Sequence, residues 1–286
     1  MTVRRTGTRP KIRTRTDLNQ AALDGPLPGN GGGRGLSFGE TSVMPQNVFV
    51  GDVAKYYDVT SEEHFAPAML DPTVDFLTDI ADGGRALEFA IGTGRVALPL
   101  RARGVEVHGV DISEDMAAEL HAKPGGADIR VTIGDMATTR LSESFALVYL
   151  VFNTISNLLT QAEQVACFRN AAAHLEPGGC FVVELQIPQL RRMPPGESAY
   201  PFSLTDAHLG FDTYDFGEQR LTSHHYWFAG DRTHRFDSHH RYAWPAELDL
   251  MAELAGLRLR ERWAGWDRSP FRGESDEHVS VWEKPH

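Results

Sequence analysis

Residues 86–97 read ALEFAIGTGRVA, and this stretch indicates the fold more clearly than any other part of the chain. It opens with a short apolar run that is typical of a buried strand and continues into a turn that contains Gly92 and Gly94. Apolar residues after the turn predict a helix over residues 95–103. A glycine turn between a strand and a helix lets a ligand approach backbone N–H groups closely. The stretch therefore predicts a strand–turn–helix unit with a ligand site at the turn.

The alternation of strand and helix continues outward from this unit. Residues 145–151 (FALVYLV) are almost wholly apolar, as expected for a parallel strand that is buried on both faces. The whole pattern predicts a doubly wound, Rossmann-like α/β sheet. The other predicted strands are 105–110, 129–133, 180–185, 257–263 and 278–282, and the other predicted helices are 113–121, 161–175 and 246–255.

Between residues 186 and 244 the alternation of strand and helix patterns ends, and no long helix is predicted. Segments 209–216, 220–228 and 233–244 alternate polar with apolar or aromatic residues, and glycine-containing turns separate them. We interpret them as a small antiparallel sheet inserted over the main sheet. The predicted organisation is a tail at 1–46, an α/β core at 47–185, the inserted sheet at 186–244, and a last helix with two core strands at 245–286.

The predicted tail differs from the rest of the chain in composition. It carries seven basic against three acidic side chains, and residues 26–35 are nearly all Gly, Pro and Asn. Such a segment cannot bury enough apolar surface to offset its ordering entropy, so we expect disorder. The alternatives are a basic arm that docks on the acidic body or on an anionic partner, and a natural start at Met44.

Composition excludes several classes of protein. The chain has 286 residues, 41% hydrophobic and 23% charged, with a net charge of −11, which argues against nucleic acid as the main partner. It contains no apolar run long enough to cross a membrane. Two cysteines, Cys167 and Cys180, exclude a disulfide scaffold and suit a reducing compartment. We expect a cytoplasmic monomer or homodimer without a membrane partner.

Three acidic residues are placed where a nucleoside ligand would need them. Glu88 lies in the strand before the glycine turn, where a carboxylate suits an ammonium group better than a pyrophosphate. Asp111 ends the next strand and can accept hydrogen bonds from two ribose hydroxyls. Asp135 follows the third strand, where it can accept from an adenine amino group while Met136 covers the ring. The turn alone also fits the G-x-G-x-x-A dinucleotide fingerprint, so a nicotinamide-dependent oxidoreductase is an alternative.

Each acid also has a purely structural interpretation. Glu88 could form an ion pair with Arg85 or Arg95, and Asp111 could cap the helix that follows it. Asp135 could be an ordinary turn aspartate.

With these acids in this order, residues 50–286 resemble the class I S-adenosylmethionine-dependent methyltransferases. In that family the first acid contacts the methionine amine, the second holds the ribose and the third reads adenine. Residues 175–179 (LEPGG) also look like a turn that recurs in the family. The resemblance implies a seven-stranded sheet with its last strand antiparallel and S-adenosylmethionine as cofactor; a non-catalytic protein that binds S-adenosylmethionine is an alternative. The implied cofactor contacts are Tyr57, Glu88, Ala90, Gly92, Gly94, Asp111, Ile112, Met116, Asp135, Met136 and Phe152.

The acceptor should lie at the carboxyl ends of the strands. Residues 152–157 (FNTISN) lack the Asn/Asp-Pro-Pro-aromatic signature of nucleic-acid amine methyltransferases, and residues 53–58 (VAKYYD) resemble the aromatic lid of small-molecule relatives. The inserted sheet resembles that of glycine/sarcosine and amino-sugar N-methyltransferases. We therefore expect methyl transfer to nitrogen or oxygen of a small molecule, in specialised metabolism. The expected substrate contacts are Tyr56, Asn153, Asn157, Tyr226 and Trp266.

The inserted sheet is rich in histidine. Adjacent histidines on a strand point to opposite faces, and no H-x-H or E-x-x-H motif accompanies them, so no metal site is predicted. A base is needed only if the acceptor must lose a proton. His240 is our first candidate, followed by Tyr242 on the same predicted strand face and by His225. Catalysis by proximity alone, on a neutral amine, is the alternative.

Overall fold

The computed structural model describes residues 49–60, 65–230 and 232–286. The predicted tail and the proposed start at Met44 lie outside these residues. None of the described helices is long and apolar enough to cross a membrane.

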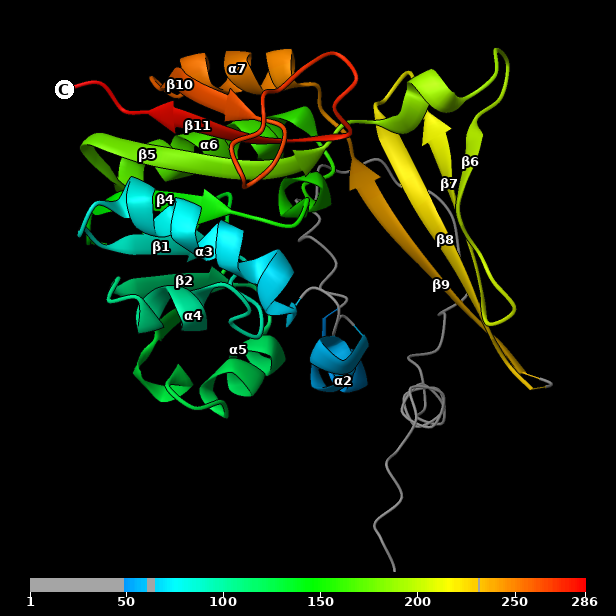
Figure 1. Ribbon diagram of the computed structural model, residues 1–286, viewed down its shortest axis with the longest axis horizontal. Helices are drawn as coiled ribbons and strands as arrows, with labels where there is room; N and C mark the ends of the chain where they lie inside the picture. Colours follow the sequence, from blue (N-terminus) through cyan, green and yellow to red (C-terminus); the bar gives the residue numbers. More distant parts are fainter. Residues whose placement is uncertain (1–48, 61–64, 231) are drawn as a thin grey trace, which may run out of the picture.

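The core is a seven-stranded sheet in the order β10-β11-β5-β4-β1-β2-β3 (Figure 1). β1 runs parallel to β2 and β4, β2 parallel to β3, and β4 parallel to β5, whereas β11 is antiparallel to both β5 and β10. The Rossmann-like sheet and its antiparallel last strand are therefore confirmed. The bounds are β1 Ala86–Phe89, β2 Val107–Asp111, β3 Arg130–Ile133, β4 Phe145–Leu150, β5 Leu175–Gln186, β10 Arg258–Trp263 and β11 Glu277–Glu283.

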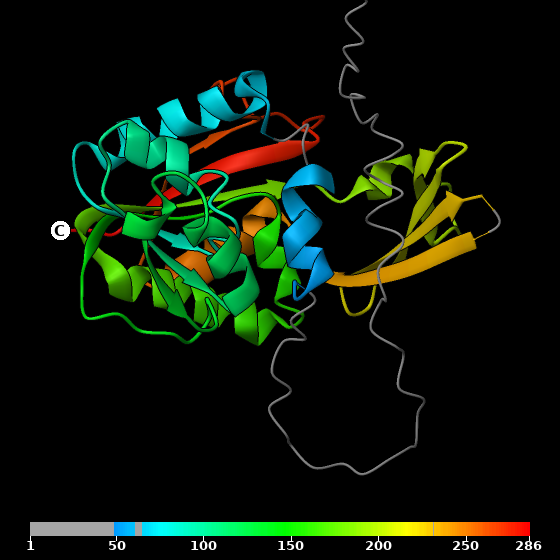
Figure 2. The ribbon, with the colours of Figure 1, turned by 90° about the horizontal axis from the view of Figure 1, so that it is seen from below.

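Helices cover both faces of this sheet (Figure 2). Phe76 of α3, Leu100 of α4 and Leu120 of α5 pack in one buried cluster, and Phe168 of α6 and Leu248 of α7 pack in the other. The helices are α2 Asp52–Thr60, α3 Pro67–Ala81, α4 Ala97–Ala102, α5 Glu114–His121, α6 Gln161–His174 and α7 Pro245–Leu254, with 3₁₀ turns η2 Gly126–Asp128, η3 Thr154–Asn157 and η4 Gln189–Arg192.

Two features of the core differ from the sequence-based expectation. The helix α3 was not predicted, because Pro72 interrupts its sequence and no side chain caps its start. The expected turn at 175–179 belongs to β5, which begins directly after α6. Phe145 pairs with Leu175 and Leu147 with Cys180, so the intervening residues bulge out of the ladder, and Gly178 takes a φ of 81°.

The inserted sheet has four antiparallel strands in the order β6-β7-β8-β9, where three were predicted. It lies beyond the carboxyl ends of the parallel strands (Figure 1). A buried ion pair joins it to the core: Arg241 reaches Glu247 of α7 at 2.6 Å and Gln164 of α6 at 2.6 Å. The strands are β6 Ala199–Leu204, β7 His208–Asp215, β8 Arg220–Ala229 and β9 Arg232–Arg241.

Candidate functional site

The glycine turn after β1 has a left-handed backbone at Ala90, Gly92 and Gly94, with φ of 52°, 57° and 78°. Positive φ at a residue with a Cβ is strained, and such strain clusters at functional sites. A Cβ on Gly94 would lie 2.9 Å from the Leu120 side chain, so this glycine lets the turn pack on α5. Gly92 lies beside the methyl end of Met116, a buried residue of α5. The turn is thus closely packed against the side chains of α5.

Asp111, at the end of β2, holds the turn in place. Its carboxylate accepts from the backbone N–H of Gly92 at 2.7 Å and from that of Ser113 at 2.8 Å. Burial raises the pKa of Asp111, and these amides oppose the rise. Ser113, not Asp111, caps α5, because its hydroxyl accepts from the Met116 amide. A carboxylate has about four lone-pair sites. The backbone N–H of the half-buried Ile112 also hydrogen-bonds to Asp111, so backbone amides take three of these sites and one remains for a ligand hydroxyl.

Glu88 is buried on β1 and has a partner that sequence reasoning missed. Tyr149 stands opposite it on β4, and the phenol donates to the Glu88 carboxylate at 2.8 Å. Burial raises the pKa of Glu88 to about 8, although the Tyr149 hydrogen bond and the charge of Arg95 oppose this. Arg85 instead donates to the carbonyl of Ser144. Glu88 is thus buried and not at the surface, and of the two arginines considered as its partners Arg95 acts on its charge.

Asp135 and Met136 follow β3 at the same edge of the sheet. Asp135 is half-buried and accepts from the Ala137 amide at 2.7 Å, which is a local turn contact. Met136 packs against the core cluster, and its carbonyl accepts from the Asn170 side chain at 2.7 Å. One oxygen of Asp135 is thus used by its own turn.

The helix α2 lies over the glycine turn. Asp58 accepts from the Thr93 hydroxyl at 2.6 Å and forms an ion pair with Lys123, which in turn donates to the Thr93 carbonyl at 2.8 Å. These three residues, here called the latch, tie α2 to the turn and to the end of α5. Tyr57 is half-buried, and the charges of Arg95 and Asp111 act on its hydroxyl, whose pKa burial raises.

The loop after β4 carries three of the predicted site residues. Phe152 and Asn153 have positive φ, 57° and 60°. The Phe152 ring is 37% exposed and lies 5.1 Å from the Arg95 guanidinium. Glu184 of β5 accepts from the Phe152 amide at 2.6 Å and from the Trp266 indole N–H at 2.8 Å. Glu184 was not predicted, and it joins Phe152 to Trp266.

His240 is the first candidate for the base. Its Nδ1 lies 3.1 Å from the Asn157 side-chain oxygen, so Nδ1 carries the proton, and its Nε2 lies 2.9 Å from the Ser238 hydroxyl. Burial lowers the pKa of His240 to about 4. Both ring nitrogens are thus engaged in this structure, and the role of His240 as a base stays a prediction. Tyr242 lies one residue beyond β9, buried against the ring of Tyr214 at 5.9 Å.

The remaining candidates divide between the two faces of the inserted sheet. By strand alternation, His225 and His240 share the face that reaches Asn157 of the core, whereas Tyr226 points to the other face. Tyr226 stacks there on Phe211 at 6.2 Å. Tyr226 thus lies on the face opposite His225, and its expected contact with the substrate stays a prediction. Tyr56 of α2 is half-buried beneath the Lys55 ammonium.

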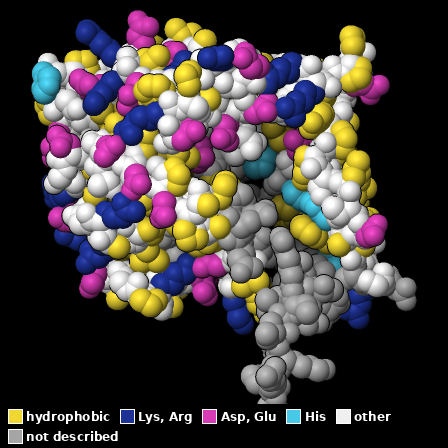
Figure 3. Space-filling model, in the orientation of Figure 1, with side chains coloured by type: hydrophobic (Ala, Val, Ile, Leu, Met, Phe, Trp, Pro, Cys, Tyr) yellow, Lys and Arg dark blue, Asp and Glu magenta, His cyan; other side chains and the backbone are white. Residues whose placement is uncertain are grey.

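The face that carries His225 is aromatic. His208 stacks on Trp227 at 3.8 Å and lies 3.1 Å from His225, and Phe202 and Phe236 pack beside them. Burial lowers the pKa of both His208 and His225. Figure 3 shows histidine and apolar side chains gathered on the side of this sheet that is turned toward the core. We call these five residues the aromatic face.

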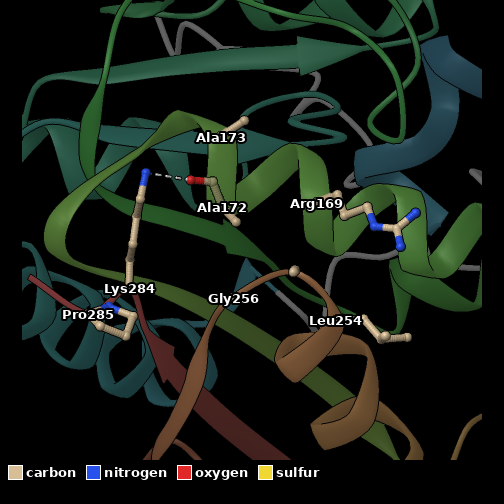
Figure 4. A pocket seen from close by; sticks show the side chains of 8 residues that line it. Arg169, Ala172, Ala173, Leu254, Gly256, Lys284 and Pro285 are labelled. Carbon is tan, nitrogen blue, oxygen red and sulfur yellow. Dashed lines mark hydrogen bonds between the residues drawn. The ribbon is translucent and has the colours of Figure 1, made fainter.

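The described residues hold no metal-binding cluster, and one groove lies away from the site. Within the described ranges, no group of three or more His, Cys, Asp or Glu side chains could hold a metal ion. A groove of about 600 Å³ lies between α6, α7 and the C-terminus (Figure 4). There Lys284 donates to the carbonyls of Ala172 and Leu175, at the end of α6 and the start of β5. The groove therefore lies at the opposite end of the sheet from the three acids.

Comparisons with known proteins point to one kind of enzyme. The family described as "Methyltransferase domain" matches residues 86–179. The structure of the CcbJ methyltransferase from Streptomyces caelestis has a TM-score of 0.69 and 38% identity, over 75% of this chain and 89% of that one.

Two curated relatives add to this finding. The cypemycin N-terminal methyltransferase of a Streptomyces species is 26% identical over 238 residues, which is 80% of this chain and 97% of the relative. The dTDP-3-amino-3,4,6-trideoxy-alpha-D-glucopyranose N,N-dimethyltransferase of Streptomyces venezuelae is 35% identical over 115 residues, which is 37% of this chain and 48% of the relative.

Proposed function

Because this chain belongs to the class I S-adenosylmethionine-dependent methyltransferases, we propose that it methylates an amino nitrogen of a small molecule. When bound, S-adenosylmethionine supplies a methyl group on a sulfonium, already activated for displacement. The observation that carries the proposal is the set of three acids, Glu88, Asp111 and Asp135, at neighbouring strand ends below one aromatic lid. The curated relatives described above support it, because both are named for methylation at an amine.

The residues present suit this cofactor. The buried carboxylate of Glu88, which accepts from the Tyr149 phenol, has the chemistry to hold an ammonium group. Asp111 would accept from the ribose with the lone pair that its backbone hydrogen bonds leave. Asp135 would accept from the adenine amino group with its second oxygen. The latch would hold α2 closed over these contacts and exclude water.

Nitrogen is preferred over oxygen because both ring nitrogens of His240, the first-ranked candidate for the base, are engaged. A hydroxyl acceptor must lose its proton to become a good nucleophile, whereas a neutral amine can attack directly and lose a proton afterwards. His240 is neutral at pH 7 but has both ring nitrogens engaged. The chain's contribution would then be positioning and desolvation.

The acceptor would lie between the lid, residues 152–157, Trp266 and the aromatic face. The rings of the aromatic face carry no charge near neutral pH, because the pKa values of His208 and His225 are lowered. Such a face favours an uncharged ring of the acceptor, while the reacting amine points to the strand ends. A role in specialised metabolism stays a prediction.

The test is methyl transfer from a donor with an isotopically labelled methyl group. The purified protein is incubated with pairs of compounds, each pair being an amino sugar or a peptide with a free N-terminus and its hydroxyl counterpart, and products are identified by mass spectrometry. Label should appear in amines and not in their hydroxyl counterparts. Label in the hydroxyl member of a pair would contradict the nitrogen assignment. The Glu88→Gln variant serves as the control for donor-dependent transfer.

A further inference from the structure

Glu184 occupies a junction between two segments that are far apart in the sequence. Its Oε2 accepts from the backbone N–H of Phe152 at 2.6 Å, and its Oε1 accepts from the indole N–H of Trp266 at 2.8 Å. Phe152 starts the loop after β4, whereas Trp266 lies in the connection between β10 and β11. Both oxygens of one carboxylate are thus committed to two elements on opposite sides of β5.

The segment that Glu184 holds on the β4 side is strained. Phe152 and Asn153 are consecutive residues with positive φ, an arrangement that costs energy in residues with a Cβ and persists only when neighbours impose it. The strand β5 supplies both restraints: Glu184 binds the Phe152 amide, and the Gln186 amide donates to the Asn153 side-chain oxygen at 2.6 Å. The orientation of Phe152 therefore depends on the last residues of β5.

On the β11 side, Glu184 holds the connection between β10 and β11 through the aromatic side chain of Trp266. Trp266 contacts Phe76 of α3 edge to face, with ring centroids 5.4 Å apart, and is half-buried. Its indole N–H has Glu184 as its partner, so this hydrogen bond selects the rotation of the ring. Phe152 in turn lies against Arg95 of the glycine turn at 5.1 Å. One carboxylate therefore ties the backbone of Phe152 to the indole ring of Trp266.

We propose that Glu184 is a positioning residue for the methyl acceptor: it fixes Phe152 and Trp266 as the two sides of the entrance through which the acceptor amine reaches the donor methyl group. This rests on the proposed function for the place of the acceptor. Glu184 acts through these two rings and has no chemical role in the transfer. A glutamine at this position offers one acceptor oxygen where the structure presents two donors, so one of the two bonds must be lost.

The first measurement does not need an acceptor. In the ¹⁵N-labelled protein, the Phe152 amide and the Trp266 indole N–H resonances are compared between wild type, Glu184→Gln and a matched control, Glu176→Gln, which changes an exposed residue at the other end of β5. We expect Glu184→Gln to shift both resonances, because both donors lose a charged acceptor, and to speed hydrogen exchange at least tenfold at the group whose bond is lost, with no change in the control. If neither the resonances nor the exchange rates of the two groups change in Glu184→Gln, Glu184 does not join the two segments and the proposal is overturned.

The second measurement uses an amine found to be methylated in the labelled-donor assay. We expect Glu184→Gln to raise the KM for the amine about tenfold or more, with kcat within about threefold and the Kd for S-adenosylhomocysteine within about threefold. Trp266→Phe should raise KM similarly, and the double variant should be no worse than the poorer single variant, because contacting residues couple. Additive effects, or an unchanged KM, would overturn the proposal. If no amine is methylated, the proposed function fails. The Phe152 and Trp266 resonances still show whether Glu184 joins the two segments.

Discussion

Replacing Tyr149 by phenylalanine should weaken cofactor binding in a way that depends on Glu88. The phenol donates to the Glu88 carboxylate at 2.8 Å, and this bond favours the ionised form. A hydrogen bond to a charged group contributes about 1.5–3 kcal/mol, and one pKa unit corresponds to about 1.4 kcal/mol. Loss of the phenol should therefore raise the pKa of Glu88 by a further one to two units or so.

The sign of the pH dependence follows from the raised pKa. With a pKa of about 8 in the free protein, Glu88 is mostly protonated at pH 7 and must ionise to hold the cofactor ammonium. Binding between pH 6 and 7 should release about one proton, and affinity should rise about tenfold over that interval. Above pH 8 the affinity stops rising, because the amino group of the ligand loses its positive charge there; an α-amino group has a pKa of about 7.7–8.0.

Calorimetry with S-adenosylhomocysteine, in buffers of different ionisation enthalpy, measures both the affinity and the proton release. At pH 7 the Tyr149→Phe variant should bind about 10- to 100-fold more weakly than wild type. The Glu88→Gln variant should bind weakly and without pH dependence. Wild-type affinity that is constant from pH 6 to 7, with no proton released, would refute the assignment of the ammonium to Glu88. So would Tyr149→Phe binding within twofold of wild type.

Three further predictions concern other parts of the site. Asp111→Asn should lower affinity for S-adenosylhomocysteine at least tenfold in calorimetry, because each bond lost to a charged acceptor costs about 1.5–3 kcal/mol; affinity within twofold of wild type would remove the ribose assignment. Lys123→Met should speed dissociation of S-adenosylhomocysteine up to about fivefold in stopped flow, since a partly exposed ion pair contributes about 0.2–1 kcal/mol. Arg101→Met, which breaks an exposed pair with Asp128, is its control, and equal rates in both variants would exclude the latch. His240→Asn should keep the methylation rate within about threefold across pH 6–9, whereas a loss of about 10²–10⁴-fold that high pH partly restores would reinstate His240 as the base.

The centre of the sheet could be predicted because β1, β4 and β5 are largely apolar and the turn after β1 contains glycine. The elements that escaped prediction lack these signals. The strand β6 (AYPFSL) contains a proline and is largely exposed, so its pattern resembles a loop. The helix α3 has an apolar spacing at Leu70, Val74, Leu77 and Ala81 that suits a helix, and Pro72 concealed it.

A candidate site residue could be proposed from the sequence only where one residue and its place in or after a strand were enough. The three acids were proposed in this way, and their roles stay predictions. Tyr149 and Glu184 escaped because their roles depend on which strands become neighbours, and on partners that lie 61 and 82 residues away in sequence. His240 was ranked first because imidazole has a suitable pKa, but burial and Asn157 decide its behaviour.

The most direct test of the account is a crystal structure of the complex with S-adenosylhomocysteine. The account predicts the amino nitrogen of the ligand within hydrogen-bonding distance of the Glu88 carboxylate, with the ribose hydroxyls on Asp111 and the adenine beside Asp135. A ligand whose amino group lies away from Glu88, or whose ribose does not reach Asp111, would contradict it.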